Sequence, residues 1–331
     1  MDILNNAVIT YDCIKASVDV TEKELSDFSV EKGDMLFQRS SETLEDVGRA
    51  NVYMDDKTAV FGGFVIRGKK KGEYDPQYFN YLLRSPFARK RIIPMGAGAQ
   101  HFNIGQEGLS KVKLHFANIE EQNKIGKMLS LLDERISIQS KIIDKLQSLI
   151  KGIRNDVFGK LRKNIGFNAV VGDVLDYEQP QSYIIEDTEY TNEGTPVLTA
   201  NKAFVLGYTL ETDGIYDKGD CIIFDDFTLD CKYVDFPFKV KSSAIKILTA
   251  KNKELLHYTF EFLKYLDLST EEHKRHYIAE TQNQEFILPT EQMVKTIAHI
   301  FSILSLRMET AVKQRDEFEK QKQYLLRQMF I

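Results

Sequence analysis

The chain has 331 residues, of which 43% are apolar and 28% are charged, and its net charge is −5. This composition excludes a disordered protein, and the length allows two domains that each have a core. No run of about 18 apolar residues indicates a membrane span, the N-terminus lacks a secretory signal, and three cysteines without metal-ligand spacing (Cys13, Cys221, Cys231) predict a reduced, cytoplasmic location.

Residues 1–118 are predicted to form a first mixed α/β domain. Its expected elements are strands at 33–37, 51–54 and 59–68, a helix at 75–93, a Gly-rich loop at 95–108 and a strand at 109–116. Residues 61–115 hold ten Lys and Arg against three Asp and Glu, whereas residues 1–60 hold six against thirteen. The basic half could steer a polyanion, although a solvated charged surface explains the same pattern equally well.

Residues 119–160 are predicted to form a long helix, because apolar residues recur in steps of four and three. Residues 161–289 are predicted to form a second mixed domain. Its strands are expected within 195–209, 219–234 and 238–248, followed by a helix at 251–266. Residues 290–331 are predicted to form a second long helix with the same apolar spacing. A shift of 172 residues superimposes the two helical patterns, so the chain contains an internal repeat.

The repeat extends into the mixed domains. GDMLF (33–37) matches GDCIIF (219–224), and AQHFN (99–103) occupies the place of TQNQEF (281–286). The helix positions expected to form interfaces are Ile125, Leu129, Leu132, Ile136, Ile143 and Leu146 in the first copy, and Ile297, Phe301, Leu304, Met308, Phe318 and Leu325 in the second. Arg315 and Lys322 stand at such positions in the second copy, which predicts a more polar end that faces another protein.

Polar side chains gather after the predicted strands of both domains. FQRSSET (37–43) and GAGAQHFNIG (96–105) supply hydrogen-bonding groups suited to phosphates or base edges, and a plain structural loop is as consistent with the Gly-rich segment. A nucleotide-binding loop is disfavoured there, because a strand is expected to follow instead of a helix. In the second domain, Asp225 and Asp226 point opposite ways on a strand, so we expect no divalent metal site from them.

EEHKRHYI (271–278) is the remaining segment of interest. His273 and His276 have helical spacing for zinc, but no further ligand accompanies them, so a basic and aromatic patch is the better interpretation. No arrangement of a nucleophile with a base occurs in the sequence. We therefore expect no catalytic residue, no bound metal and no cofactor in this chain.

Four segments together resemble the DNA specificity subunits of type I restriction–modification systems: GDMLFQRSSETLEDVG (33–48), FGGFVIR (61–67), NIGQEGL (103–109) and EEQNKIGKMLSLLDERI (120–136). The second domain, with TPVLTANKAFVLGYT (195–209) and IIFDDFT (222–228), resembles another target recognition domain of that family. The resemblance implies an α+β protein. Two mixed α/β target recognition domains are each followed by a long helix, and the helices pack as an antiparallel coiled coil.

The resemblance also implies a non-catalytic function. Each domain would read half of a split site in double-stranded DNA, and the helices would dock methyltransferase (modification) subunits, which restriction subunits join. S-adenosylmethionine, ATP and Mg²⁺ would belong to those partners. We predict that the DNA-contacting residues are Gln38, Arg39, Ser40, Ser41, Thr43, Gln100 and Asn103 in the first domain, and Lys202, Asp226, Thr228, Lys232, Lys274, Arg275 and Tyr277 in the second.

One departure from the family pattern concerns the first domain. Only 32 residues precede Gly33, whereas 60 separate Phe158 from Gly219, which predicts an N-terminally truncated first domain. Such a chain could be a partial or recombination-donor specificity subunit that is inactive alone. Two rival hypotheses are a coiled-coil scaffold without DNA affinity and a Mg²⁺-dependent nuclease, although the sequence offers no credible metal cluster for a nuclease.

Overall fold

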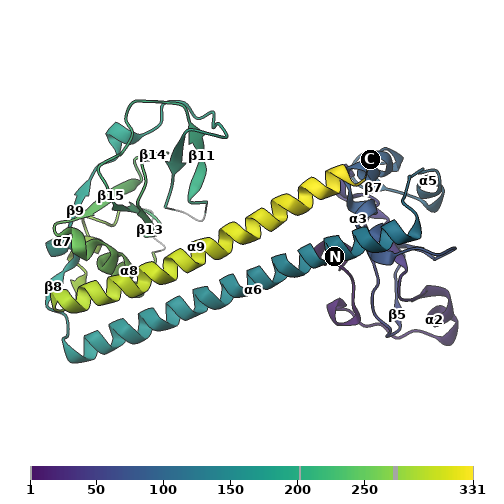
Figure 1. Ribbon diagram of the computed structural model, residues 1–331, viewed down its shortest axis with the longest axis horizontal. Coiled ribbons are helices and arrows are strands. Elements are labelled where there is room, and N and C mark those ends of the chain that lie inside the picture. The colour runs from purple at the N-terminus through teal and green to yellow at the C-terminus, as the bar shows by residue number, and fades with distance from the viewer. Residues whose placement is uncertain (1, 201–202, 271–274, 331) are drawn as a thin grey trace. The chain divides into compact units, whose positions relative to one another are not determined.

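The computed structural model describes residues 2–200, 203–270 and 275–330 (Figure 1). The chain divides into two compact units. Unit 1 comprises Met1–Ile142 and Ala311–Ile331, and unit 2 comprises Ile143–Thr310. Each unit therefore contains one mixed α/β domain together with a portion of both long helices, α6 (Ile119–Asn164) and α9 (Glu291–Gln328).

Unit 1 is built around a three-stranded antiparallel sheet of order β4–β2–β6. Its elements before α6 are α1 (Asp2–Asn5), α2 (Glu22–Phe28), β1 (Ser29–Val30), β2 (Met35–Gln38), β3 (Ser40–Ser41), β4 (Ala50–Val52), β5 (Ala59–Val60), β6 (Val65–Gly68), α3 (Pro76–Arg84), α4 (Pro86–Ile92), β7 (Phe102–Asn103) and α5 (Gln106–Ser110), with short 3-10 turns at Tyr11–Cys13, Leu44–Asp46 and Ile93–Met95.

Two sequence predictions for this unit were wrong in detail. The single helix expected at 75–93 is two helices, because Pro86 cannot continue the hydrogen-bond ladder of α3 and Ser85 instead accepts a bond from the Ala88 amide at 3.3 Å, which begins α4. The strand expected at 109–116 does not form. Residues 106–110 are α5, and residues 111–118 have no regular structure.

The helix pair completes the core of unit 1. Tyr78 and Leu82 of α3 are buried against Leu129 and Leu132 of α6 and Leu326 of α9. A second cluster lies between the sheet and α4, where Val47, Val52 and Ile92 are almost fully buried. The mixed domain thus packs against its part of the helices through α3.

Unit 2 contains a four-stranded sheet of order β13–β12–β15–β9 and a three-stranded sheet of order β11–β10–β14. Its elements between the long helices are β8 (Ala169–Val170), α7 (Val171–Val174), β9 (Leu175–Glu178), β10 (Thr195–Leu198), β11 (Val205–Thr209), β12 (Cys221–Asp225), β13 (Cys231–Val234), β14 (Lys239–Val240), β15 (Ile245–Ala250), α8 (Leu256–Leu266) and β16 (Glu285–Phe286), with 3-10 turns at Gln181–Tyr183, Lys253–Leu255 and Thr281–Asn283.

The internal repeat is visible in the strands that follow the two Gly-Asp pairs. β2 and β12 each lie between two antiparallel neighbours, β4 and β6 in one unit and β13 and β15 in the other. Gly33 and Gly219 precede these strands with the same positive φ of 94°, a conformation that favours glycine. The match of GDMLF with GDCIIF therefore reflects a shared turn and a shared central strand.

The helix seam agrees with the heptad prediction. Every interface position named from the sequence is buried or half-buried. In unit 1, the Gln139 side chain donates to the Ala311 carbonyl and to Gln314 Oε1, both at 3.1 Å, and Lys322 pairs with Asp133. Asp133 of α6 contacts Lys322 of α9, and the later residue Gln139 contacts the earlier residue Ala311, so the two helices run antiparallel in this unit. Lys322, expected to face another protein, instead meets a carboxylate across the seam.

The seam of unit 2 is apolar by comparison. Phe158 of α6 is fully buried with Val294, Ile297 and Phe301 of α9. On the other side, Arg154 forms an ion pair with Glu261 of α8 at 2.7 Å, and Glu261 is 2% exposed. Among the described residues, no helix is long and apolar enough to span a membrane.

Candidate nucleic-acid interface

In unit 1, two segments about sixty residues apart meet at the end of β2. β3 pairs with β7 in antiparallel register, with Ser40 opposite Asn103 and Ser41 opposite Phe102. Ser40 Oγ donates to Asn103 Oδ1 at 2.5 Å, and the Ile104 amide donates to the Arg39 carbonyl at 2.9 Å. The polar residues of FQRSSET and of the Gly-rich loop, which the sequence singled out separately, thus form one edge.

The side chains of this edge differ in how free they are. Arg39 and Gln100 are exposed, and Arg39 has no carboxylate within ion-pair distance among the described residues. Ser40, Ser41 and Gln38 are half-buried, and Gln38 Nε2 donates to the Ser40 carbonyl at 2.9 Å. Thr43 is exposed but donates to Asp46 at 2.9 Å. The edge therefore combines a free guanidinium with hydroxyl and amide groups that are held by hydrogen bonds within the edge, a combination suited to phosphates and base edges.

In unit 2, the end of β12 is organised by Asp226, which is 1% exposed. Asp226 Oδ1 accepts from the His276 amide at 3.1 Å and from the Tyr277 amide at 2.8 Å, and Oδ2 lies 3.2 Å from Lys246 Nζ. Lys246 is itself fully buried and also donates to Gln179 Oε1 at 2.8 Å. Since all of these bonds are internal, the carboxylate positions the loop and has no free edge for a base.

Tyr277 has a similar place beneath the surface. Its ring is 1% exposed and packs edge-on against Phe224 and Tyr177, with centroids 5.4 and 5.5 Å apart. Burial raises the pKa of the Tyr277 phenol. The ring therefore supports the segment that carries Arg275, which is exposed and reaches Ser243 Oγ at 3.5 Å.

The other predicted DNA contacts of unit 2 differ in their exposure. Thr228 is exposed on the turn after β12, where Asp225 Oδ1 accepts from the amides of Phe227 and Thr228 at 2.9 Å, so Asp225 caps a turn. Lys232 is half-buried on β13. Lys202 and Lys274 lie outside the described residues.

Sequence reasoning missed Lys246 and Gln179, which hold Asp226 in place. A signal for Lys246 was available, because a lysine in the apolar strand SAIKIL requires a buried partner. The expected counterpart segment also differs. The segment 281–286 was expected to correspond to 99–103, but its residues Glu285 and Phe286 pair with β8 and not with β12. The residue that bonds next to β12 is His276, whose amide donates to the Asp226 carbonyl at 3.0 Å. Arg275–Tyr277 thus takes the place beside β12 that Phe102–Ile104 takes beside β2.

Comparisons with known proteins agree with this layout. Residues 1–148 match the family described as the type I restriction modification DNA specificity domain. The chain is 44% identical over 126 residues to the specificity subunit of the type I restriction enzyme EcoR124I/EcoR124II from Escherichia coli, a region that covers 36% of this chain and 31% of that protein. It is 29% identical over 108 residues to the MjaVIII specificity subunit from Methanocaldococcus jannaschii, covering 32% of this chain and 25% of that protein.

A solved structure extends the comparison to both units. The crystal structure of the type I restriction–modification system S subunit from M. genitalium has a TM-score of 0.64 with this chain at 16% sequence identity, and the match covers 92% of this chain and 84% of that one. At this identity the likeness concerns the fold. The curated relatives, by contrast, are matched over about a third of their length or less.

Proposed function

We propose that the chain is a DNA specificity subunit of a type I restriction–modification system and that it reads a split site in double-stranded DNA, one half with each unit. The match of residues 1–148 to the specificity domain and the likeness of the fold support this proposal. The observation that carries this proposal is the β3–β7 edge of unit 1, where Ser40 and Asn103 are joined at 2.5 Å beside the free side chain of Arg39. Arg39 would contact phosphate or guanine, and the hydroxyl and amide groups would contact base edges.

In unit 2 the proposed contacts come from the surface above the buried Asp226. Arg275 and Thr228 are exposed there, with Lys232 at the neighbouring strand. Basic residues would bind phosphates and fix the orientation, and the turn after β12 would face the groove. Lys202 and Lys274 remain proposed contacts from the sequence.

The chain would be non-catalytic and would act through partners. Along α6 in unit 1, Leu131, Ile138 and Ile142 are 40–49% exposed and lie on one side of the helix, away from the seam. In unit 2, Ile300, Ile303 and Leu306 of α9 are 41–64% exposed. These apolar side chains are proposed docking positions for helices of the methyltransferase subunits, and restriction subunits would join that assembly. S-adenosylmethionine, ATP and Mg²⁺ would be bound by those partners.

Methylation mapping tests the proposal. Cells that carry this chain with the modification subunits of its system should show a split adenine-methylated motif, which should disappear when the chain is deleted. The Arg39→Ala and Arg275→Ala variants should each weaken methylation of that motif. The purified assembly should also lose DNA affinity as salt rises. A methylome unchanged by deletion would favour a scaffold without a DNA function.

A further inference from the structure

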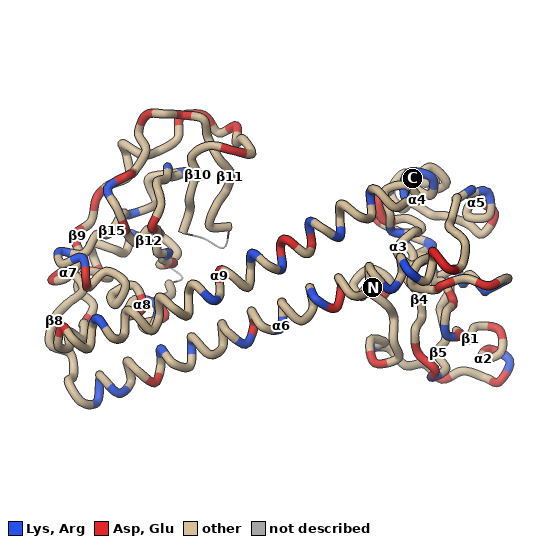
Figure 2. Tube along the Cα trace, in the orientation of Figure 1, with Lys and Arg blue, Asp and Glu red and all other residues tan. Residues whose placement is uncertain are grey.

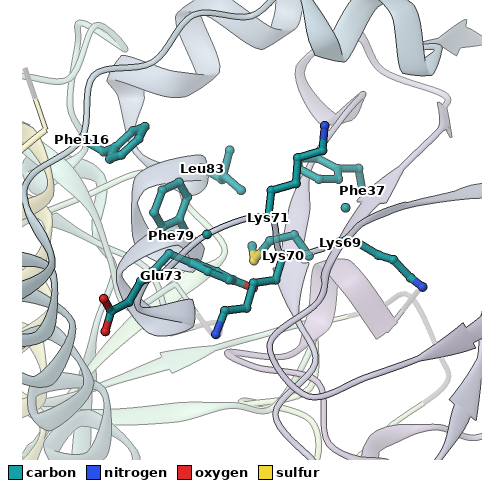
Figure 3. A pocket seen from close by; sticks show the side chains of 12 residues that line it. Phe37, Lys69, Lys70, Lys71, Glu73, Phe79, Leu83 and Phe116 are labelled. Atoms are coloured by element: carbon teal, nitrogen blue, oxygen red, sulfur yellow. The ribbon is translucent and has the colours of Figure 1, made fainter.

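Unit 1 contains a hollow of about 390 Å³ that the DNA-reading proposal does not use (Figure 3). Its floor consists of apolar and aromatic side chains, among them Phe37, Phe79 and Leu83. Phe116 stands at its border and is 61% exposed. The other border is the segment Lys69–Glu73, in which three successive lysines are followed by one carboxylate, so its net charge is positive. A hollow of this size and lining is typical of a ligand or docking site.

The lysine loop lies at the opposite end of β2 from the proposed DNA edge. β6 pairs with β2 so that Met35 faces Gly68 and Gln38 faces Val65. The lysines directly follow Gly68, whereas Arg39 directly follows Gln38. Four strand residues span about 10 Å, so the hollow and the proposed DNA edge are separate groups of side chains at the two ends of the strand. The nature of its occupant therefore has to be argued from the chemistry of the hollow itself.

The loop is held in place while its charges lack carboxylate partners. Tyr74 donates to the Gly33 carbonyl, and its ring packs edge-on against Phe79 with centroids 5.3 Å apart. Lys69, Lys70 and Lys71 are all exposed, and among the described residues no carboxylate lies within ion-pair distance of any of them. Three adjacent cations repel one another, and an anionic partner would relieve that repulsion.

The chemistry of the hollow identifies the class of partner. Duplex DNA would satisfy the lysines, but its phosphates would gain nothing from Phe79, Leu83 and Phe116. An acidic amphipathic helix would satisfy both, because carboxylates would face the lysines while apolar side chains at positions i and i+3 or i+4 filled the hollow. We propose that this surface of unit 1 docks an acidic amphipathic helix of a partner protein.

A defined peptide tests the proposal on the full chain. The probe is a fluorescein-labelled 16-residue helix of Leu, Phe, Glu and Asp with one apolar face, and its control has the same composition in an order that destroys that face. Fluorescence anisotropy should show that the amphipathic peptide binds about tenfold more tightly than the control peptide. Equal affinity of the two peptides would overturn the proposal.

Two variants locate the site. The K69E/K70E/K71E variant and the Phe116→Ser variant should each weaken binding of the amphipathic peptide about tenfold. The matched control is K15E/K23E/K90E, which makes the same charge change at exposed residues of the same unit outside the hollow. A control variant that weakens binding as much as the loop variant would contradict the proposed site.

A parallel titration with DNA distinguishes a protein partner from DNA. A 30-base-pair duplex of arbitrary sequence is titrated against each variant at the same salt concentration. We expect K69E/K70E/K71E to reduce peptide affinity more than duplex affinity, and Phe116→Ser to reduce only peptide affinity. If the lysine substitutions act on the duplex alone and Phe116→Ser changes neither affinity, the lysines serve DNA and the proposal is wrong. Circular dichroism of each variant confirms that it is folded.

Discussion

The ends of β2 and β12 are equivalent positions of the internal repeat, yet they are stabilised in different ways. In unit 1 a short pair of strands joins the loop to β7, and the side-chain bond from Ser40 to Asn103 lies at the surface. In unit 2 a buried carboxylate, Asp226, gathers two amides and the buried lysine Lys246. Figure 2 shows where Lys and Arg and where Asp and Glu lie along the trace of each unit. One edge depends on backbone pairing, and the other depends on a buried ion pair.

This difference indicates at which of the two edges side chains can be substituted without loss of stability. A surface hydrogen bond contributes little to stability, so residues of the unit 1 edge can be replaced without loss of the fold. A buried charge that loses its partner is strongly destabilising. In unit 1, substitutions at the edge itself should therefore change DNA specificity without loss of the fold. In unit 2, only substitutions of the exposed residues should do so, because substitution of the buried Asp226 or Lys246 would destabilise the fold.

The largest expected effect is that of Asp226→Ala. The substitution leaves Lys246 buried without an opposite charge and removes the acceptor of two loop amides, so the free energy of unfolding of unit 2 should fall by about 3–5 kcal/mol. Denaturant unfolding, followed by a probe in unit 2, measures the change. Asp230→Ala, at an exposed position on the same turn, is the matched control and should change stability by less than about 0.5 kcal/mol. Equal effects at the two positions would remove the distinction between the edges.

A second buried pair in unit 2 gives a pH-dependent prediction. Burial raises the pKa of Glu261, and the Arg154 guanidinium opposes this rise. Because the pKa of folded Glu261 lies above that of the unfolded chain, the stability that Glu261 contributes is complete below the unfolded pKa and is lost as the pH rises through the folded pKa. Arg154→Met should raise the folded pKa further and destabilise unit 2 by up to about 3 kcal/mol at pH 8.

The same variant should be much closer to the wild type at pH 4, where Glu261 is protonated in both proteins. Chemical denaturation at the two pH values measures the difference. The double variant R154M/E261Q is the control, since it removes the titrating group, and its stability relative to the wild type should depend less on pH. A loss at pH 4 as large as the loss at pH 8 would show that Arg154 acts by packing, for instance against Phe301, whose ring centroid lies 5.8 Å from its guanidinium.

The helix seam shows the same contrast between the units on a smaller scale. In unit 1, Lys322 pairs with Asp133, which also accepts from the buried Tyr81 hydroxyl at 2.7 Å. The Lys322 and Asp133 side chains are about a quarter exposed. Lys322→Met should therefore lower the free energy of unfolding by only about 1 kcal/mol, and high salt should diminish that loss. Lys320→Met, at an exposed position on the same helix, is the control. A loss comparable to that of Asp226→Ala would show that the seam of unit 1 is as dry as the core of unit 2.

The sequence predicted the structure best in the long helices and in the segments of the internal repeat. The long helices, their seam positions and the equivalence of β2 with β12 follow from heptad spacing and from a glycine that needs a positive φ. The strand expected at 109–116 was wrong, because a short alternation of apolar and polar residues does not show whether a neighbouring strand is available. Asp226 and Tyr277 were named as DNA contacts, and their burial depends on long-range partners such as Lys246 that no local pattern displays.

The smallest effect on stability is expected at the edge of unit 1, where Ser40→Ala removes the bond to Asn103. Both residues lie at the surface, so the free energy of unfolding should change by less than about 0.5 kcal/mol. DNA selectivity should nevertheless change, because Asn103 Oδ1 loses its donor and the amide is then held only by its bond to the His101 carbonyl at 3.3 Å. Affinity for the first half-site should fall by about 1 kcal/mol, or about fivefold, with little change in the salt dependence, since no charge is removed.

Arg39→Ala provides the contrast, because loss of a phosphate contact should weaken binding to all sequences and reduce the salt slope by about one. If Ser40→Ala instead unfolds unit 1 as Asp226→Ala unfolds unit 2, the two ends of the repeat depend on their polar groups equally.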